Sequence, residues 1–142
     1  MNVNPYERDV HEAVADALDK MLLKPAFWFP YPAGVTQLSP QQHARYSRFG
    51  LKRGLPDIWI LYDGVWLIEL KRRGGQLSKT RTVSTKRGTL RVLEGQVDVF
   101  PKLCASGAVR DIAVCYTVDD VLDQIERWKI PILRRVFSGV AS

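Results

Sequence analysis

The sequence predicts an α/β fold whose elements run in the order helix, strand, strand, strand, helix, strand, helix. Three observations lead to this prediction: an amphipathic pattern over residues 5–23, a hairpin signal over residues 58–70, and a strand-then-helix pattern over residues 111–129. At 142 residues with 46% hydrophobic content, the chain can bury a substantial core. We therefore expect residues 1–142 to form a single domain.

Residues 5–23 predict the first helix, with Asn4 as a possible N-cap and Pro5 at the first helical position. At 100° per residue, the apolar arc of this helix contains Val10, Val14, Ala17, Leu18 and Met21. Glu7 falls inside the arc, either as an acid favoured at a helix N-terminus or as a carboxylate of a metal site. His11 borders the arc; it could contact phosphate, but the position favours an ordinary surface histidine.

Residues 27–35 are aromatic but are interrupted by Pro30 and Pro32. Because proline cannot donate to a central ladder, this segment predicts an edge strand or an irregular aromatic segment.

The hairpin at 58–70 has two possible registers, both compatible with the turn dipeptide Asp63-Gly64. A two-residue loop would place Asp57 and Glu69 on opposite faces. A three-residue loop with Gly64 in the left-handed conformation pairs Leu61 with Val65 and brings the two carboxylates together. We predict the three-residue loop because it creates a site, although a bend before residue 58 could achieve the same.

Asp57, Glu69 and Lys71 are charged residues at the ends of otherwise apolar strands. Side chains two residues apart on a strand share a face, so Glu69 and Lys71 point the same way. Such groups are costly to desolvate without a cation or an anionic ligand, and carboxylate oxygens suit Mg²⁺ or Mn²⁺. The alternative is that Asp57 caps a turn while Glu69 and Lys71 lie at a solvated strand end.

Two basic segments without acids lie on either side of these strands, and the formal net charge of +6 indicates a polyanionic partner. We expect basic loops at residues 36–54 and 72–91, the second long enough to be functional or disordered. The expected phosphate contacts are Arg45, Arg48, Lys52, Arg53, Arg72, Arg73, Lys79, Arg81, Lys86 and Arg87.

Residues 92–106 predict a helix, residues 111–117 a buried strand, and residues 118–129 a second helix. Gln96 lies on the apolar side of the first of these helices, where its amide could orient a water, contact nucleic acid or be a satisfied core group. A tail from about residue 130 could pack on the domain or serve a partner subunit.

Several classes of protein are disfavoured. No apolar run approaches the length of a membrane span, and no signal peptide precedes the first helix. The two cysteines show no zinc spacing, and nothing indicates a small-molecule cofactor. We expect a cytoplasmic protein.

The motifs and their order resemble the PD-(D/E)XK nucleases and, more narrowly, the VRR-NUC (virus-type replication–repair nuclease) domain. The matching pieces are ERDVH at residues 7–11, GLPD at 54–57, ELK at 69–71 and GQLSK at 75–79, followed by Gln96 and Gly107. The resemblance extends to about residue 126. It departs from the family at His11, where glutamine is usual, in the short interval between Asp57 and Glu69, and in the basic stretch from 80 to 92 that precedes Gln96.

The resemblance implies a restriction-endonuclease-like core, with a central mixed β-sheet flanked by helices. Asp57 and Glu69 would be metal ligands with the backbone carbonyl of Leu70, Lys71 the catalytic lysine, Glu7 the helix carboxylate and Gln96 the helix glutamine. One or two Mg²⁺ or Mn²⁺ ions would be bound.

The resemblance also implies a function. Small members look like homodimeric endonucleases that cut branched DNA such as four-way (Holliday) junctions, as in DNA repair. The alternatives are a non-catalytic DNA-binding accessory module, or a nuclease for linear DNA or RNA.

Overall fold

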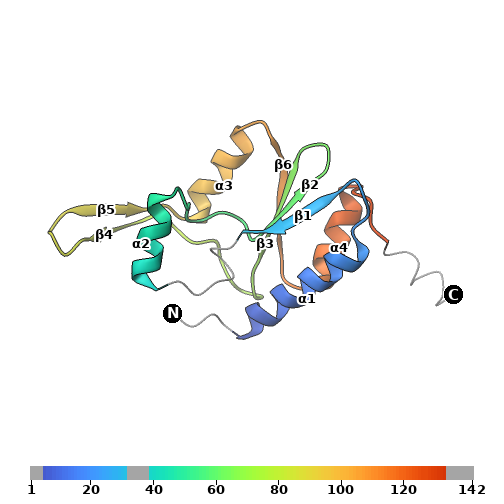
Figure 1. The fold of residues 1–142 in the computed structure, drawn as a ribbon, viewed down its shortest axis with the longest axis horizontal. Coiled ribbons are helices and arrows are strands. Elements are labelled where there is room, and N and C mark those ends of the chain that lie inside the picture. The colour runs from blue at the N-terminus through green and yellow to red at the C-terminus, as the bar shows by residue number, and fades with distance from the viewer. Residues whose placement is uncertain (1–4, 32–38, 134–142) are drawn as a thin grey trace.

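The computed structural model describes residues 5–31 and 39–133, apart from the side chains of residues 5–7 and His43. A four-stranded sheet in the order β1-β2-β3-β6 forms its centre (Figure 1). Its strands are β1 (Phe27–Pro30), β2 (Ile58–Leu61), β3 (Val65–Leu70) and β6 (Val109–Cys115). The first three are antiparallel, whereas β6 runs parallel to β3. The α/β class and a mixed sheet flanked by helices are confirmed.

Helices cover both faces of the sheet. In Figure 1, α1 (Pro5–Met21) and α4 (Val118–Arg127) lie on one face and α3 (Gln96–Ala105) lies on the other. The alternation of side chains explains this arrangement, because Ile58, Ile60, Ile68 and Leu70 point from β2 and β3 into a core shared with Val14, Leu18, Val121 and Ile125. Glu69 must then point to the opposite face, toward α3.

The predicted register of the hairpin is confirmed. Leu61 pairs with Val65, which leaves a three-residue loop. Asp63 has φ 45° and Gly64 has φ 122°, so the residue nearest the left-handed value is Asp63 and not Gly64 as predicted. The pairing of Ile58 with Ile68 places Asp57 directly beside Glu69.

The predicted edge strand is confirmed for Phe27–Pro30, since β1 lies at one edge of the sheet. The part of that prediction from residue 32 to residue 35 lies outside the described residues.

The expectation of a basic loop at residues 36–54 is wrong for residues 40–48, which form α2 (Pro40–Arg48). Ser39 accepts from the backbone N–H of Gln42, whose side chain accepts from the backbone N–H of Ser39, and Pro40 occupies the first turn. This capping box is visible in the sequence. The helix is almost wholly exposed, so it lacks the apolar periodicity on which the prediction depended.

The expectation of a long loop at residues 72–91 is also wrong in part, because β4 (Arg81–Ser84) and β5 (Leu90–Leu93) form a separate antiparallel hairpin. The helix predicted from residue 92 begins only at Gln96, since residues 92 and 93 belong to β5. Neither face of the ribbon is fully buried against the domain, so the alternation of apolar and polar residues is confined to two short runs.

The beginning of the tail packs on the domain. Ile130 is buried in the core, and Ile132 forms an isolated bridge with Leu22. Residues 134–142 of the predicted tail lie outside the described residues. Among the helices of the described chain, none is both long and apolar enough to cross a membrane.

Candidate metal and nucleic-acid site

Asp57 and Glu69 form the centre of the candidate site. The two residues are 6% and 3% exposed, and their carboxyl groups are close enough to hydrogen bond. Asp57 Oδ2 also accepts from the backbone N–H of Leu70 at 2.8 Å. The strand ends thus hold two carboxyl groups side by side in a largely buried position.

The pKa of Glu69 is raised from 4.5 to about 10, by burial first and then by the hydrogen bond and negative charge of neighbouring Asp57. The positive charge of Lys71 and a hydrogen bond from Gln96 oppose the rise, and both are weaker influences. Two carboxylates so close together cannot both be ionised at low cost unless a cation joins them.

Gln96 is 8% exposed, and its side-chain amide is held between two partners. Its Nε2 donates to Glu69 Oε2 at 2.6 Å, and its Oε1 accepts from the backbone N–H of Ser78 at 3.1 Å. Ser78 thereby orients the amide so that its NH₂ group faces the carboxylate.

Residues 78–80 also cap the N-terminus of α3, which begins after a glycine that has no capping side chain. Ser78 Oγ accepts from the N–H of Gln96, the carbonyl of Ser78 accepts from the N–H of Val97, and Thr80 Oγ1 accepts from the N–H of Gly95. A Cβ on Gly95 would lie 2.3 Å from the carbonyl carbon of Lys79. Only glycine permits this approach.

Lys71 and His11 complete the surroundings of the carboxylates. Lys71 follows β3 and lines the same pocket as Asp57 and Glu69. His11 comes from α1, and its Nε2 lies 3.8 Å from Asp57 Oδ2. The sequence favoured a surface histidine at this position, although its place beside the apolar arc of α1 was a signal that it faces inward.

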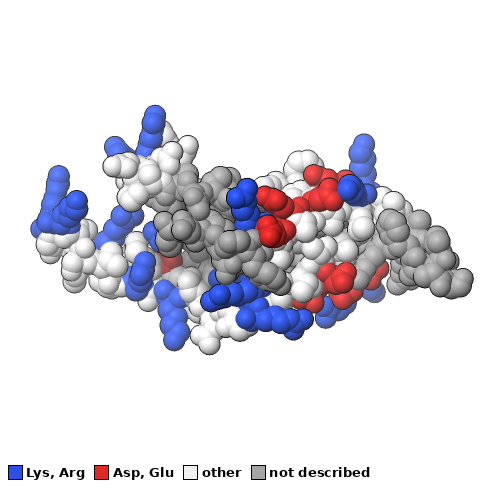
Figure 2. All heavy atoms as spheres, turned by 90° about the horizontal axis from the view of Figure 1, so that it is seen from below, with Lys and Arg blue, Asp and Glu red and all other residues white. Residues whose placement is uncertain are grey.

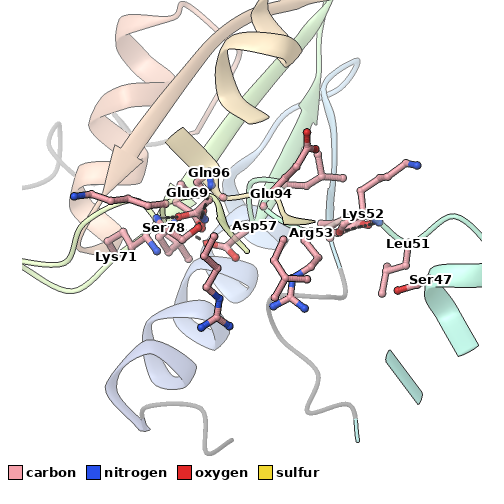
Figure 3. A pocket seen from close by; sticks show the side chains of 18 of the residues that line it. Ser47, Leu51, Lys52, Arg53, Asp57, Glu69, Lys71, Ser78, Glu94 and Gln96 are labelled. Atoms are coloured by element: carbon pink, nitrogen blue, oxygen red, sulfur yellow. Dashed lines mark hydrogen bonds between the residues drawn. The ribbon is translucent and has the colours of Figure 1, made fainter. Parts of the chain in front are cut away.

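These groups line a pocket of about 580 Å³. Figure 3 shows Asp57, Glu69, Lys71, Ser78 and Gln96 gathered on one side, and Ser47, Leu51 and Lys52 on the side near α2. On the side near α2, Tyr31 holds the backbone of Lys52. Its hydroxyl accepts from the N–H of Lys52 at 2.9 Å and donates to the carbonyl of Lys52 at 3.0 Å. No sequence pattern indicated this contact.

Four of the ten residues predicted to contact phosphate line this pocket: Lys52, Arg53, Lys79 and Arg81. Arg45 and Arg48 lie in the last turn of α2, and Lys86 and Arg87 lie between β4 and β5. Arg72 and Arg73 follow β3, and Arg73 lies 5.9 Å above the ring of Tyr116, outside the pocket lining. In Figure 2, Lys and Arg gather over the end of the molecule with α2 and the β4–β5 hairpin, and most of the visible Asp and Glu lie over the other half.

Other predicted groups are placed less completely. Glu7 lies in the first turn of α1, but its side chain is outside the described residues. Leu70 lines the pocket. In the described part of the chain, no group of three or more His, Cys, Asp or Glu side chains is placed to bind one metal ion. Of the predicted catalytic and metal-binding residues, the structure therefore brings Asp57, Glu69, Leu70, Lys71 and Gln96 to one pocket, together with the four basic residues named above.

Comparisons with known proteins add no family assignment: no family model, no curated protein and no solved structure matches this chain.

Proposed function

We propose that this protein is a Mg²⁺- or Mn²⁺-dependent DNA endonuclease with a restriction-endonuclease-like core of the VRR-NUC type. The observation that carries the proposal is the adjacent pair Asp57 and Glu69, largely buried yet lining a pocket with basic walls. Motif resemblance and this geometry support the same site independently.

The donor groups suit a hard divalent cation. Two carboxylates supply anionic oxygens, which Mg²⁺ and Mn²⁺ prefer, and their mutual repulsion would be relieved by a shared cation. The high pKa of Glu69 reflects the cost of ionising that carboxyl without one. Asp57, Glu69 and the backbone carbonyl of Leu70 would hold one ion, with Glu7 available to a second ion or its water.

A bound cation would supply Lewis-acid stabilisation of the phosphate and a more acidic water. Lys71 would orient the attacking water or offset the negative charge that develops on the phosphate. Gln96 would fix the orientation of Glu69, and Ser78 would fix that of Gln96. Lys52 and Arg53 on one wall and Lys79 and Arg81 on the other would bind the flanking phosphates.

The proposed substrate is branched DNA such as a four-way junction, and the proposed active form is a homodimer. Symmetric cleavage of two strands requires two sites related by a two-fold axis, which pairing of two chains would provide.

The test is cleavage of junction, flap and linear duplex DNA with Mg²⁺, Mn²⁺ or EDTA. We expect cleavage only with the metals, and loss of cleavage in Asp57→Asn and Lys71→Ala. Asp16→Asn and Lys20→Ala are matched controls, because this exposed pair on α1 lies outside the pocket lining. Cleavage that persists in either site variant removes the mechanism.

The same experiment distinguishes the rival functions. Salt-sensitive DNA binding without cleavage, unchanged in Asp57→Asn, would identify a non-catalytic binding module. Activity on RNA or on linear DNA that exceeds activity on the junction would keep the chemistry and replace the substrate.

A further inference from the structure

The β4–β5 hairpin is a basic ribbon that stands away from the central sheet (Figure 1). From Lys71 to Leu93 the sequence contains no acid, and the hairpin itself carries Arg81, Lys86, Arg87 and Arg91, all exposed. Among the described residues, none of these four forms an ion pair. An excess of positive charge on an exposed ribbon attracts polyanions such as nucleic acid.

One face of the ribbon has no neighbour in the described part of the domain. The register pairs Thr82 with Val92 and Ser84 with Leu90, so these four side chains point to the same face. All four are exposed, with Leu90 at 75% and Val92 at 61%. Hydroxyl groups and small apolar groups are the chemistry that contacts base edges and thymine methyl groups in a DNA groove.

The base of the ribbon is fixed to the candidate active site. Residues 78–80 lead into β4 and cap α3 through Gln96, Val97 and Gly95, and Gln96 in turn holds Glu69. Whatever the ribbon binds is therefore placed at a set distance from the two carboxylates.

We infer that the β4–β5 hairpin is a duplex-binding arm that lies in the major groove beside the scissile phosphate. A two-stranded ribbon fits the major groove, whose width is about 12 Å. From Arg81 to Lys86 the ribbon spans roughly 17 Å, or about five base pairs. Thr82, Ser84, Leu90 and Val92 face the base edges. Lys86 and Arg87, in the turn between the two strands, contact phosphates at the tip of the ribbon. The inference rests on the proposed function, since the DNA is the substrate of the same site.

The test measures binding in EDTA, so that no cleavage is needed. The double variant Lys86→Gln, Arg87→Gln is compared with wild type on duplex and single-stranded oligonucleotides at several salt concentrations. We expect the slope of log affinity against log salt on duplex to fall by about 2, which corresponds to about 0.9 for each of the two phosphates that are no longer neutralised. The charge-matched control is Lys20→Gln, Lys24→Gln, two exposed residues outside the pocket and the hairpin, which should retain the wild-type slope.

A second variant tests the face of the ribbon. Leu90→Ser with Val92→Thr alters two exposed positions and leaves the charges unchanged, so the domain should fold normally by circular dichroism. We expect several-fold weaker duplex binding with an unchanged salt slope, and unchanged single-strand binding.

Three results would contradict the duplex-binding arm. The first is a hairpin variant whose salt slope matches that of the control, and the second is an equal loss of affinity for duplex and for single strands. The third is a change from dimer to monomer in sedimentation, with the duplex affinity of each protomer unchanged. The last would make the ribbon an interface between copies. If duplex binding depends on the hairpin but wild type cleaves no DNA, only the proposed function is contradicted. If wild type cleaves DNA but its binding does not depend on the hairpin, only the inference about the duplex-binding arm is contradicted.

Discussion

Glu69 illustrates how one register decides the chemistry of a side chain. The pairing of Leu61 with Val65 turns Asp57 to the same face as Glu69, and the alternation along β3 buries that face under α3. The consequence is a carboxyl group whose pKa is raised by burial first and by Asp57 second. A glutamate in a solvated position at the same strand end would keep its ordinary pKa.

The metal-free protein should lose stability as pH rises. The carboxyl of Glu69 releases its proton near pH 4.5 when unfolded but keeps it up to about pH 10 when folded, so the folded state binds more protons between these values. The contribution of the Glu69 carboxyl to the free energy of unfolding is complete below pH 4.5. It is lost as pH rises toward 10, by at most about 1.4 kcal/mol per pH unit.

Thermal melts in EDTA at pH 5 to 9 measure this loss. Glu69→Gln should remove most of the dependence, and the control Glu12→Gln, at an exposed pair on α1, should keep it. Parallel curves for wild type and Glu69→Gln would show that Glu69 is ionised in the folded protein.

Gln96 is expected to act through Glu69. Gln96→Ala removes the amide that donates to Glu69 Oε2, and removal of such an outer hydrogen-bond partner typically lowers metal affinity by about 10- to 100-fold. Calorimetric titration with Mn²⁺ measures the affinity, and Val97→Ala at the exposed neighbouring position is the control. Equal affinities in the two variants would assign Gln96 a purely structural role.

At the level of elements, the sequence predicted the strands of the central sheet and the helices that cover it, and missed the two elements that lie outside this unit. The register of β2 and β3 followed from Asp63-Gly64 and from the need to bring Asp57 and Glu69 together. Helix α2 and the β4–β5 hairpin were missed because both are largely exposed, so no apolar period marks them. Their signals were local: the capping box at Ser39, and the short alternating runs on either side of Lys86-Arg87-Gly88.

The site was predictable to a similar degree. Asp57, Glu69 and Lys71 stood out as charges at the ends of apolar strands, and Gln96 as an amide on an apolar helix side. The roles of Ser78 and Tyr31 depend on contacts between segments far apart in the chain, which no local pattern encodes.

The junction between residues 78–80 and α3 should be sensitive to a single methyl group. Gly95→Ala would place Cβ against backbone atoms of Ser78 and Lys79, and the forced shift should cost about 1–3 kcal/mol of unfolding free energy. Urea denaturation measures the loss, with Val97→Ala as the control. A Gly95→Ala variant as stable as wild type would show that residues 78–80 do not hold the start of the helix.

For the whole molecule, the visible acidic side chains are distributed unevenly, whereas Lys and Arg occur over both halves. The end with α2 and the hairpin is basic and flanks the pocket, whereas most of the visible Asp and Glu side chains lie over the other half (Figure 2). A polyanion is therefore drawn toward the face that holds the two carboxylates, which would need a cation to accept a phosphate.

Cation binding should stabilise the whole fold. A ligand that binds only the folded state adds about 2.7 kcal/mol at a concentration 100 times its dissociation constant. We expect Mg²⁺ and Mn²⁺ to raise the melting temperature of wild type but not of Asp57→Asn, as measured by differential scanning fluorimetry. An equal rise in both proteins would place the stabilising ion elsewhere.

The most direct test is Mn²⁺ binding followed by electron paramagnetic resonance, in which the signal of free Mn²⁺ falls as the ion binds. We predict saturable binding by wild type and by the surface control Asp16→Asn, displaced by Mg²⁺, and its loss in Asp57→Asn and Glu69→Gln. Saturable binding of equal strength in all four proteins, or none in wild type, would contradict a metal centre at the ends of β2 and β3.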